Sequence, residues 1–294
     1  MVDEPPPDLL AWAEASAGRR VVGVQQMTGG IDAHTFRLAL DNGDDVVLRV
    51  TEPDHHEDVD YLAQVLDRLA PTPIPAPLRL AHASAVGAGD VPVMLQTLLV
   101  GDPSIPVDPD DAWLDALVLT IVRMQDVGLE PWMQDRARLR WEQLDTRDGR
   151  GYEPGDELLL SRLKDVRHDV PLTPVFGHDD FWVGNTLRDG HRVVGIVDWG
   201  HAGVVSAARD VTYCAVDASL CYGLEVGDRL IDLFCQRVYV DPGEIMAWTA
   251  RSVLASRWFP EWLAGWNGLG AQVGHEQAAT RRADLLDRTL ARLG

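Results

Sequence analysis

Three oxygen-bearing side chains in the second half of the chain have the types and the spacing of a site for a hard cation and a base. Asp180, Asn185 and Asp198 follow or end two short apolar runs, residues 174–176 and 193–197, which we expect to be strands. Strands that end at polar residues hold those side chains on a rigid support. Two carboxylates and an amide oxygen suit magnesium, with one carboxylate left to act as a base.

Each of these residues also has a simpler structural interpretation, because Asp and Asn often cap helices and close turns. That interpretation is the stronger one for any single residue, but the ordered set between two strands favours a site. Zinc is not expected, since segment 176–185 has no cysteine and one histidine. Asp210, which follows a third strand-like run, is interpreted as an acid at the start of a helix.

The composition is that of a soluble globular protein of one large domain or two lobes. The chain has 294 residues, of which 46% are apolar and 24% charged, and its net charge is -20. An acidic surface repels phosphates, so we expect neither a nucleic-acid nor a membrane partner. The charge would favour cationic small molecules, although it is more simply a solubility feature.

The cysteines and the N-terminal residues indicate a cytoplasmic protein. The three cysteines are an odd number without metal-ligand spacing, so we predict buried thiols in a reducing compartment; they are Cys214, Cys221 and Cys235. The first residues have no basic and apolar signal-peptide pattern, and no apolar run is long enough to span a bilayer.

The N-terminal part is predicted to be an antiparallel sheet. Residues 21–24, 35–40 and 46–50 are strand-like, and Asn42-Gly43 is a strong hairpin signal. Short links between these three runs predict an antiparallel meander. Further apolar spacing predicts helices at residues 9–17 and 58–69 and a strand at residues 91–99.

The rest of the chain is predicted to be mostly helical. The break at Gly101-Asp102-Pro103 is the best boundary of the strand-rich part. Helical spacing follows at residues 112–124, 136–144, 157–166, 226–238, 244–263 (with a break at Pro260) and 276–293. Asp241-Pro242 predicts the start of one of these helices.

Three N-terminal residues allow two interpretations each. Gly29 and Gly30 in a hairpin most often supply positive φ angles, but they also let backbone N–H groups approach a phosphate. Arg49 lies inside an apolar strand, where it either extends to water at an edge or directs a cation at a phosphate.

Taken in order, these motifs resemble the aminoglycoside phosphotransferase family and its protein-kinase-like relatives. The resemblance covers roughly residues 20–215, and its most specific parts are the catalytic loop and the metal motif. The matching segments are Thr28-Gly29-Gly30 (phosphate-covering hairpin), Arg49 (third strand), residues 96–101 (interlobe linker), His178-Asp179-Asp180 with Asn185 (catalytic loop) and residues 196–199 (metal motif).

The resemblance implies an α+β, bilobal, protein-kinase-like fold. Residues 1–96 would form a nucleotide-binding lobe of antiparallel sheet with one helix, and residues 97–294 a larger, helix-rich lobe with the catalytic loop and substrate site. The implied activity is transfer of the γ-phosphoryl group of ATP or GTP to a hydroxyl of a small molecule such as an aminoglycoside antibiotic. A kinase of a metabolic amino alcohol or sugar and a weak nucleotide-binding pseudoenzyme are the alternatives.

The resemblance also implies roles for individual residues. Asp180 would accept or orient the proton of the attacking hydroxyl, and His178 would support the loop. Asn185 and Asp198 would hold magnesium, while Arg49 would neutralise the α- and β-phosphates. The glycines Gly29 and Gly30 would cover the phosphates, and the Thr97 carbonyl and Leu99 amide would bind the base edge.

The sequence departs from the family pattern at several positions. Asp179 stands where the family has Gly, and Asp32 and Ala33 change the hairpin. Leu62 stands where the family helix presents a Glu to the strand cation; Asp58 or Asp60 could replace that Glu. Five acids are candidates to bind an acceptor amine, although each is more simply a surface residue: Asp135, Glu142, Asp145, Asp217 and Glu261. Four tryptophans are candidates for the wall of a substrate pocket, although they are more simply core residues: Trp248, Trp258, Trp262 and Trp266.

Overall fold

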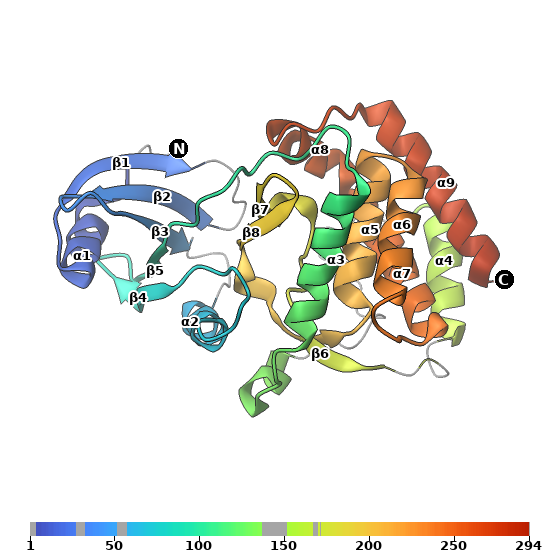
Figure 1. Cartoon of the computed structure of the whole chain (residues 1–294), viewed down its shortest axis with the longest axis horizontal. Coiled ribbons are helices and arrows are strands. Elements are labelled where there is room, and N and C mark those ends of the chain that lie inside the picture. Colours follow the sequence, from blue (N-terminus) through green and yellow to red (C-terminus); the bar gives the residue numbers. More distant parts are fainter. Residues whose placement is uncertain are drawn as a thin grey trace. The chain divides into compact units, whose positions relative to one another are not determined.

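We describe a computed structural model of the chain, for residues 4–27, 33–51, 58–136, 152–166, 170 and 172–293. Its contacts divide the chain into two compact units, which are described separately (Figure 1). The first comprises residues 1–101 and 194–200, and the second comprises residues 102–193 and 201–294. The predicted lobe boundary at residues 96/97 is five residues from this division, and the return of segment 194–200 to the first unit was not anticipated.

The first unit is built on a five-stranded antiparallel sheet of order β1-β2-β3-β5-β4. The predicted meander is confirmed, because β1, β2 and β3 pair in sequence order. Its elements are α1 (Pro7–Ala17), β1 (Val21–Met27), β2 (Ala33–Leu40), β3 (Asp45–Thr51), α2 (Val59–Leu69), β4 (Arg79–Val86) and β5 (Val91–Thr97).

One apolar cluster fixes α1 on this sheet. Leu9 and Ala13, one helical turn apart, pack with buried side chains of the strands, among them Phe36, Leu48 and Leu95. Burying such side chains is the main favourable term in folding. The edge strand β4 was not predicted, because its Ala, His and Ser residues give no clear alternation of apolar and polar side chains.

The second unit is mainly helical. Its helices are α3 (Asp111–Gln125), α4 (Pro154–Val166), α5 (Arg209–Cys221), α6 (Leu224–Cys235), α7 (Pro242–Ala255), α8 (Phe259–Gly268) and α9 (His275–Leu293). Almost every residue of α5 is buried, because α6, α7 and α9 pack around it. The predicted cap is confirmed: Asp241 accepts a hydrogen bond from the Gly243 amide, and Pro242 lies in the first turn of α7.

Two short pairs of strands lie between these helices in the sequence. β6 (Pro174–Gly177) pairs antiparallel with β9 (Gly203–Ser206), and β7 (Thr186–Asp189) pairs with β8 (Arg192–Ile196). The loop from β6 to β7 contains Asp180, and the segment after β8 contains Asp198.

The structure contradicts one sequence prediction, on the cysteines, and does not describe the segment of another. Cys214 and Cys221 are buried as predicted, but Cys235 is exposed at the end of α6, so the prediction of three buried thiols is wrong for it. The predicted helix at residues 136–144 lies almost wholly outside the described residues. No helix of the described chain is both long and apolar enough to cross a membrane.

Candidate active site

The loop after β6 holds Asp180 by two of its oxygens, the main-chain carbonyl and one carboxylate oxygen. The Asn185 side-chain nitrogen donates to the Asp180 carbonyl oxygen at 2.9 Å and to its Oδ2 at 3.1 Å. A short 3₁₀ turn, Val183–Asn185, brings the amide back toward the aspartate and buries it. Because its nitrogen is used in this way, the Asn185 side chain has its Oδ1 left to bind a cation.

Tyr213 is a second partner of Asp180 and was not singled out from the sequence. Its hydroxyl forms a side-chain hydrogen bond with the Asp180 carboxylate. Burial and the negative charge of Asp180 raise the pKa of Tyr213 well above its ordinary value of 10.0, so the hydroxyl keeps its proton and donates it. Asp180 itself is half-buried.

Asp210 has a larger role than that of a helix-start acid. It is buried in the first turn of α5, and its two oxygens accept hydrogen bonds from the His178 and Asp179 amides, each at 2.8 Å. Gly177 permits this approach, because a Cβ there would lie 2.7 Å from the Asp210 Oδ2. Sequence reasoning did not predict this contact, whose partners are about thirty residues apart.

His178 and Asp179 flank this contact and are both buried. The His178 ring packs edge-on against Phe181, with centroids 6.1 Å apart. Asp179, the residue that departs from the family pattern, has its carboxylate paired with Arg209 of α5.

In the first unit, Asp198 is paired with Arg49. The Arg49 Nη2 lies 3.2 Å from the Asp198 Oδ1, and 45% of the Asp198 side chain remains exposed against 13% for Arg49. The backbone around Asp198 is fixed on the sheet unit, because the Ile196 amide donates to the Pro75 carbonyl and the Trp199 indole to the Ile196 carbonyl. Asp198 thus presents a fixed and accessible carboxylate.

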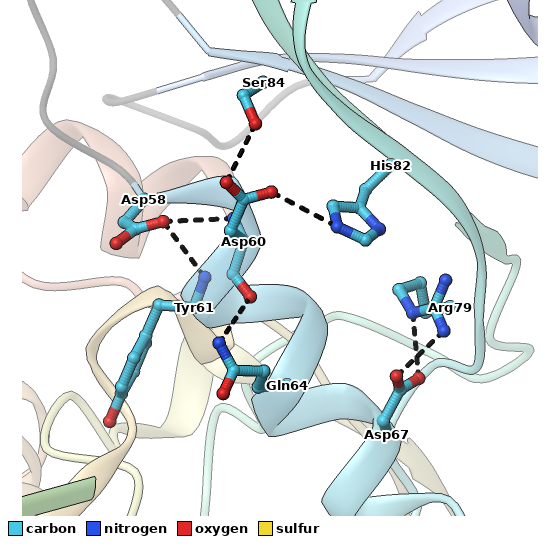
Figure 2. A network of polar contacts seen from close by, with 8 residues as sticks. All are labelled: Asp58, Asp60, Tyr61, Gln64, Asp67, Arg79, His82 and Ser84. Carbon is cyan, nitrogen blue, oxygen red and sulfur yellow. Dashed lines mark hydrogen bonds and ion pairs between the residues drawn. The ribbon is translucent and has the colours of Figure 1, made fainter. Parts of the chain in front are cut away.

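The residues considered as partners of Arg49 on α2 have other contacts (Figure 2). Leu62 is buried in the core. The Asp58 side chain caps the helix by accepting from the Asp60 and Tyr61 amides. Asp60 bonds to the Ser84 hydroxyl at 2.8 Å and lies 3.2 Å from the His82 ring nitrogen, which ties α2 to β4.

The donors predicted for magnesium fit that ion by their chemistry. Asn185 offers an amide oxygen and Asp198 a carboxylate, which are hard oxygen ligands. They belong to different units, so the two remain a predicted pair. Within the described ranges no group of three or more His, Cys, Asp or Glu side chains could hold a metal ion.

The structure describes two of the residues predicted to contact the nucleotide, Thr97 and Leu99, but not the two glycines. Gly29 and Gly30 lie outside the described residues. Thr97 is the last residue of β5, where its hydroxyl accepts from the Leu78 amide, and Leu99 follows the strand.

Asp217 corrects an expectation, because it is a buried residue and not a surface acid. It lies on α5 one turn beyond Tyr213, and its Oδ1 accepts from the Trp266 indole at 2.9 Å. Its Oδ2 is buried without a partner among the described residues. Burial raises the pKa of Asp217 from 3.8 to about 8, and the charge of Asp180 adds to this rise.

The remaining acceptor candidates follow the simpler expectation where they are described. Glu261 is exposed, and Glu142 and Asp145 lie outside the described residues, as does the side chain of Asp135. Trp248 and Trp266 are core residues, whereas Trp258 and Trp262 are half-buried.

Comparison with known proteins identifies the family. The sequence profile of the phosphotransferase enzyme family matches residues 23–248, which is more than half of the chain. No curated protein sequence matches significantly.

Solved structures share the fold. A thermostable mutant of aminoglycoside phosphotransferase APH(4)-Ia, in complex with AMP-PNP and hygromycin B, has 16% identity and a TM-score of 0.65, covering 98% of this chain and 99% of its own. Macrolide 2'-phosphotransferase MphH from Brachybacterium faecium has 18% identity and a TM-score of 0.61, covering 92% and 99%. A putative aminoglycoside phosphotransferase from Ralstonia eutropha JMP134 has 17% identity and a TM-score of 0.63, covering 97% of both. The fold is therefore protein-kinase-like, as predicted, and the chain belongs to the phosphotransferase enzyme family as a small-molecule phosphotransferase.

Proposed function

We propose that this phosphotransferase moves the γ-phosphoryl group of a nucleoside triphosphate to a hydroxyl of a small molecule, with Asp180 as the base. The observation that carries the proposal is the arrangement around Asp180, whose carboxylate is bonded by Asn185 and by the Tyr213 hydroxyl. Two donors fix the direction of the carboxylate before an acceptor arrives. Phosphoryl transfer depends mainly on such positioning and on charge neutralisation.

Asp180 accepts or orients the proton of the acceptor hydroxyl as its oxygen attacks the γ-phosphorus. The new bond joins the acceptor oxygen to phosphorus, and the bond to the β-phosphate oxygen breaks. The leaving nucleoside diphosphate carries the electron pair of that bond. Tyr213, which keeps its own proton because its pKa is raised, steadies the carboxylate without competing for the acceptor proton.

The nucleotide site is proposed from the resemblance and from the position of two charged residues. Asn185 and Asp198 would hold magnesium, which when bound neutralises phosphate charge. Arg49, oriented by Asp198, would contact the α- and β-phosphates. Gly29 and Gly30 would cover the phosphates, and Thr97 and Leu99 would bind the base. Structural neighbours were solved with AMP-PNP or ADP, which supports a nucleotide donor.

The acceptor is proposed to carry amines as well as hydroxyls, as an aminoglycoside does. Asp217 supports this, because its buried Oδ2 has no partner among the described residues, and it lies close enough to Asp180 for their charges to interact. A substrate ammonium would favour the ionised form of this carboxyl group and would pair with it. Hygromycin B, bound in one structural neighbour, is an acceptor to test first. A metabolic amino alcohol would satisfy the same chemistry.

A nucleotide-consumption screen tests the proposal. Wild-type protein is incubated with magnesium and ATP or GTP and with panels of aminoglycosides, macrolides, sugars and amino alcohols. Acceptor-dependent consumption that is lost in Asp180→Ala and kept in Asp189→Ala, an exposed aspartate of the neighbouring strand β7, is the expected result. Binding of nucleotide in a thermal-shift assay without turnover of any acceptor would instead favour a nucleotide-binding pseudoenzyme.

A further inference from the structure

The backbone next to the proposed base has an unusual conformation. Asp179 has a φ of +63°, in the left-handed region that glycine adopts readily and residues with a side chain avoid. Aspartate tolerates this region better than most residues, but it needs surrounding contacts to stay there. The side chain cannot be solvated, since 3% of it is exposed.

Arg209 supplies those contacts and holds both parts of Asp179. Its Nε donates to the Asp179 Oδ1 at 2.6 Å, and its Nη2 donates to the Asp179 carbonyl oxygen at 2.7 Å. Only 7% of the Arg209 side chain is exposed. A planar guanidinium can make two such bonds at fixed angles, so it restrains the side chain and the main chain together.

These bonds determine how the Asp179–Asp180 peptide is oriented. The Asp179 amide donates to Asp210, and the Asp179 carbonyl accepts from Arg209. That carbonyl belongs to the peptide bond whose nitrogen is the Asp180 nitrogen. Two adjacent residues of α5 therefore fix the peptide groups on either side of Asp179, and through them the starting direction of the Asp180 side chain.

Arg209 also contacts Tyr213, the residue of α5 that bonds to the Asp180 carboxylate. Its guanidinium lies 4.5 Å from the centroid of the Tyr213 ring and 5.7 Å from that of Trp248. The Tyr213 hydroxyl in turn donates a hydrogen bond to the Asp180 carboxylate. One cation thus supports both the backbone and the side-chain partner of the base.

We propose that Asp179 and Arg209 form a positioning pair that aligns the Asp180 carboxylate with the acceptor hydroxyl. The inference rests on the proposed function for its kinetic consequence. It also explains how this chain works with an aspartate at a position where the resemblance implies glycine: the side chain that fills the position has a dedicated cation on α5.

Kinetics of matched variants test the pair. Arg209→Met removes the guanidinium from the buried Asp179 carboxylate. Arg282→Met does the same to Asp156, a pair of the same type in the same unit, with side chains 12% and 1% exposed and joined at 2.6 Å between α9 and α4. With ATP, magnesium and the acceptor that the screen above selects, Arg209→Met is expected to lower kcat about 100-fold with little change in the KM for ATP. Arg282→Met is expected to keep kcat within about threefold.

A rescue separates positioning from general destabilisation. Glycine adopts the left-handed region without a side chain to be paired, so Asp179→Gly combined with Arg209→Met is expected to recover at least about tenfold of the lost kcat. If the two arginine variants lower kcat equally, or if the double variant is no better than Arg209→Met, the positioning pair is refuted. Should Arg209→Met not fold, Asp179→Asn and Arg209→Lys, each keeping part of the contact, replace it under the same criteria.

Hydrogen exchange gives a readout that needs no turnover. The amides of His178 and Asp179 should exchange faster in Arg209→Met than in the wild type, and at the wild-type rate in Arg282→Met. Equal protection in all three proteins would overturn the proposal. If the wild type phosphorylates no acceptor, the proposed function fails, while the exchange comparison still decides whether the pair fixes this loop.

Discussion

Two aspartates of this protein have the same rare backbone conformation and the same kind of partner, but opposite exposure. Asp179 in the second unit has a φ of +63° and Asp198 in the first has a φ of +64°, and each is paired with an arginine. The Asp198 side chain is 45% exposed, whereas that of Asp179 is 3% exposed.

Exposure of the carboxylate separates the tasks that these two Asp–Arg pairs can perform. An exposed carboxylate in a fixed conformation can still accept a further ligand, so Asp198 suits a cation site. Asp179 has no such freedom, because one buried guanidinium donates to both its carboxylate and its main-chain carbonyl. It therefore suits a positioning role. Strained residues cluster at functional sites, and exposure indicates which task each performs.

The largest expected effect comes from removing the exposed aspartate. Asp198→Ala should lower acceptor-dependent nucleotide consumption about 10²–10³-fold, because a charged group at the phosphates is lost. Titration of magnesium in a nucleotide thermal-shift assay should show that the metal no longer strengthens binding. Wild-type magnesium dependence in this variant would mean that Asp198 is not a ligand. The exposure of its carboxylate would then not indicate a task different from that of Asp179.

The buried Asp179–Arg209 pair should contribute more to the stability of the fold than the half-exposed Asp198–Arg49 pair. Arg209→Met leaves a buried carboxylate without its cation and should lower the free energy of unfolding by about 3–5 kcal/mol. Arg49→Met leaves the half-exposed Asp198 to water and should cost less than about 1 kcal/mol. Urea unfolding of both variants measures the difference; equal losses would show that exposure does not separate the pairs.

Asp217 provides a third case, a buried aspartate with no cationic partner among the described residues. Its folded-state pKa of about 8 lies above the ordinary 3.8, so between these values the folded protein binds a proton that the unfolded chain releases. Its contribution to stability is full below about pH 4 and falls as pH rises, by about 1.4 kcal/mol for each unit up to about pH 8.

Asp217→Asn keeps an acceptor for Trp266 and removes the titration. The free energy of unfolding of this variant should therefore exceed that of the wild type increasingly as pH rises from 5 to about 8. Parallel pH profiles for the two proteins would contradict the assignment of a neutral, buried carboxyl group.

The smallest effect is expected on α2. Asp60→Asn weakens exposed contacts to Ser84 and His82 and should change the free energy of unfolding by less than about 1 kcal/mol, with nucleotide binding unchanged. A loss of nucleotide affinity as large as that of Arg49→Met would show that Asp60, not Asp198, orients the strand arginine.

Local pattern was enough to predict most of the fold. Helical spacing and turn signals located the central strands and most of the helices, because these elements bury one face and are bounded by capping or turn residues. Local pattern failed at the edge strand β4. The predicted break at Pro260 lies instead at residues 256–258, because Pro260 is in the first turn of α8, where its missing N–H is not needed.

The site divides in a similar way. Asp180 and Asn185 could be identified because they follow a strand within a few residues, and the structure brings them together. The contacts of Asp179 with Arg209, and of Asp180 with Tyr213, join residues about thirty positions apart and depend on how α5 packs. Asp217 had the pattern of a surface acid, but the structure buries it on α5, where the Trp266 indole of α8 donates to it.

The mass of an acceptor after incubation with the protein, ATP and magnesium tests the role of Asp180 as the base. With the wild type, an acceptor from the panel should gain one phosphoryl group. With Asp180→Asn, which keeps the size of the side chain and removes the base, the acceptor should stay unmodified although ATP still binds. Phosphorylation of the acceptor at equal rates by both proteins would contradict the central role given to Asp180.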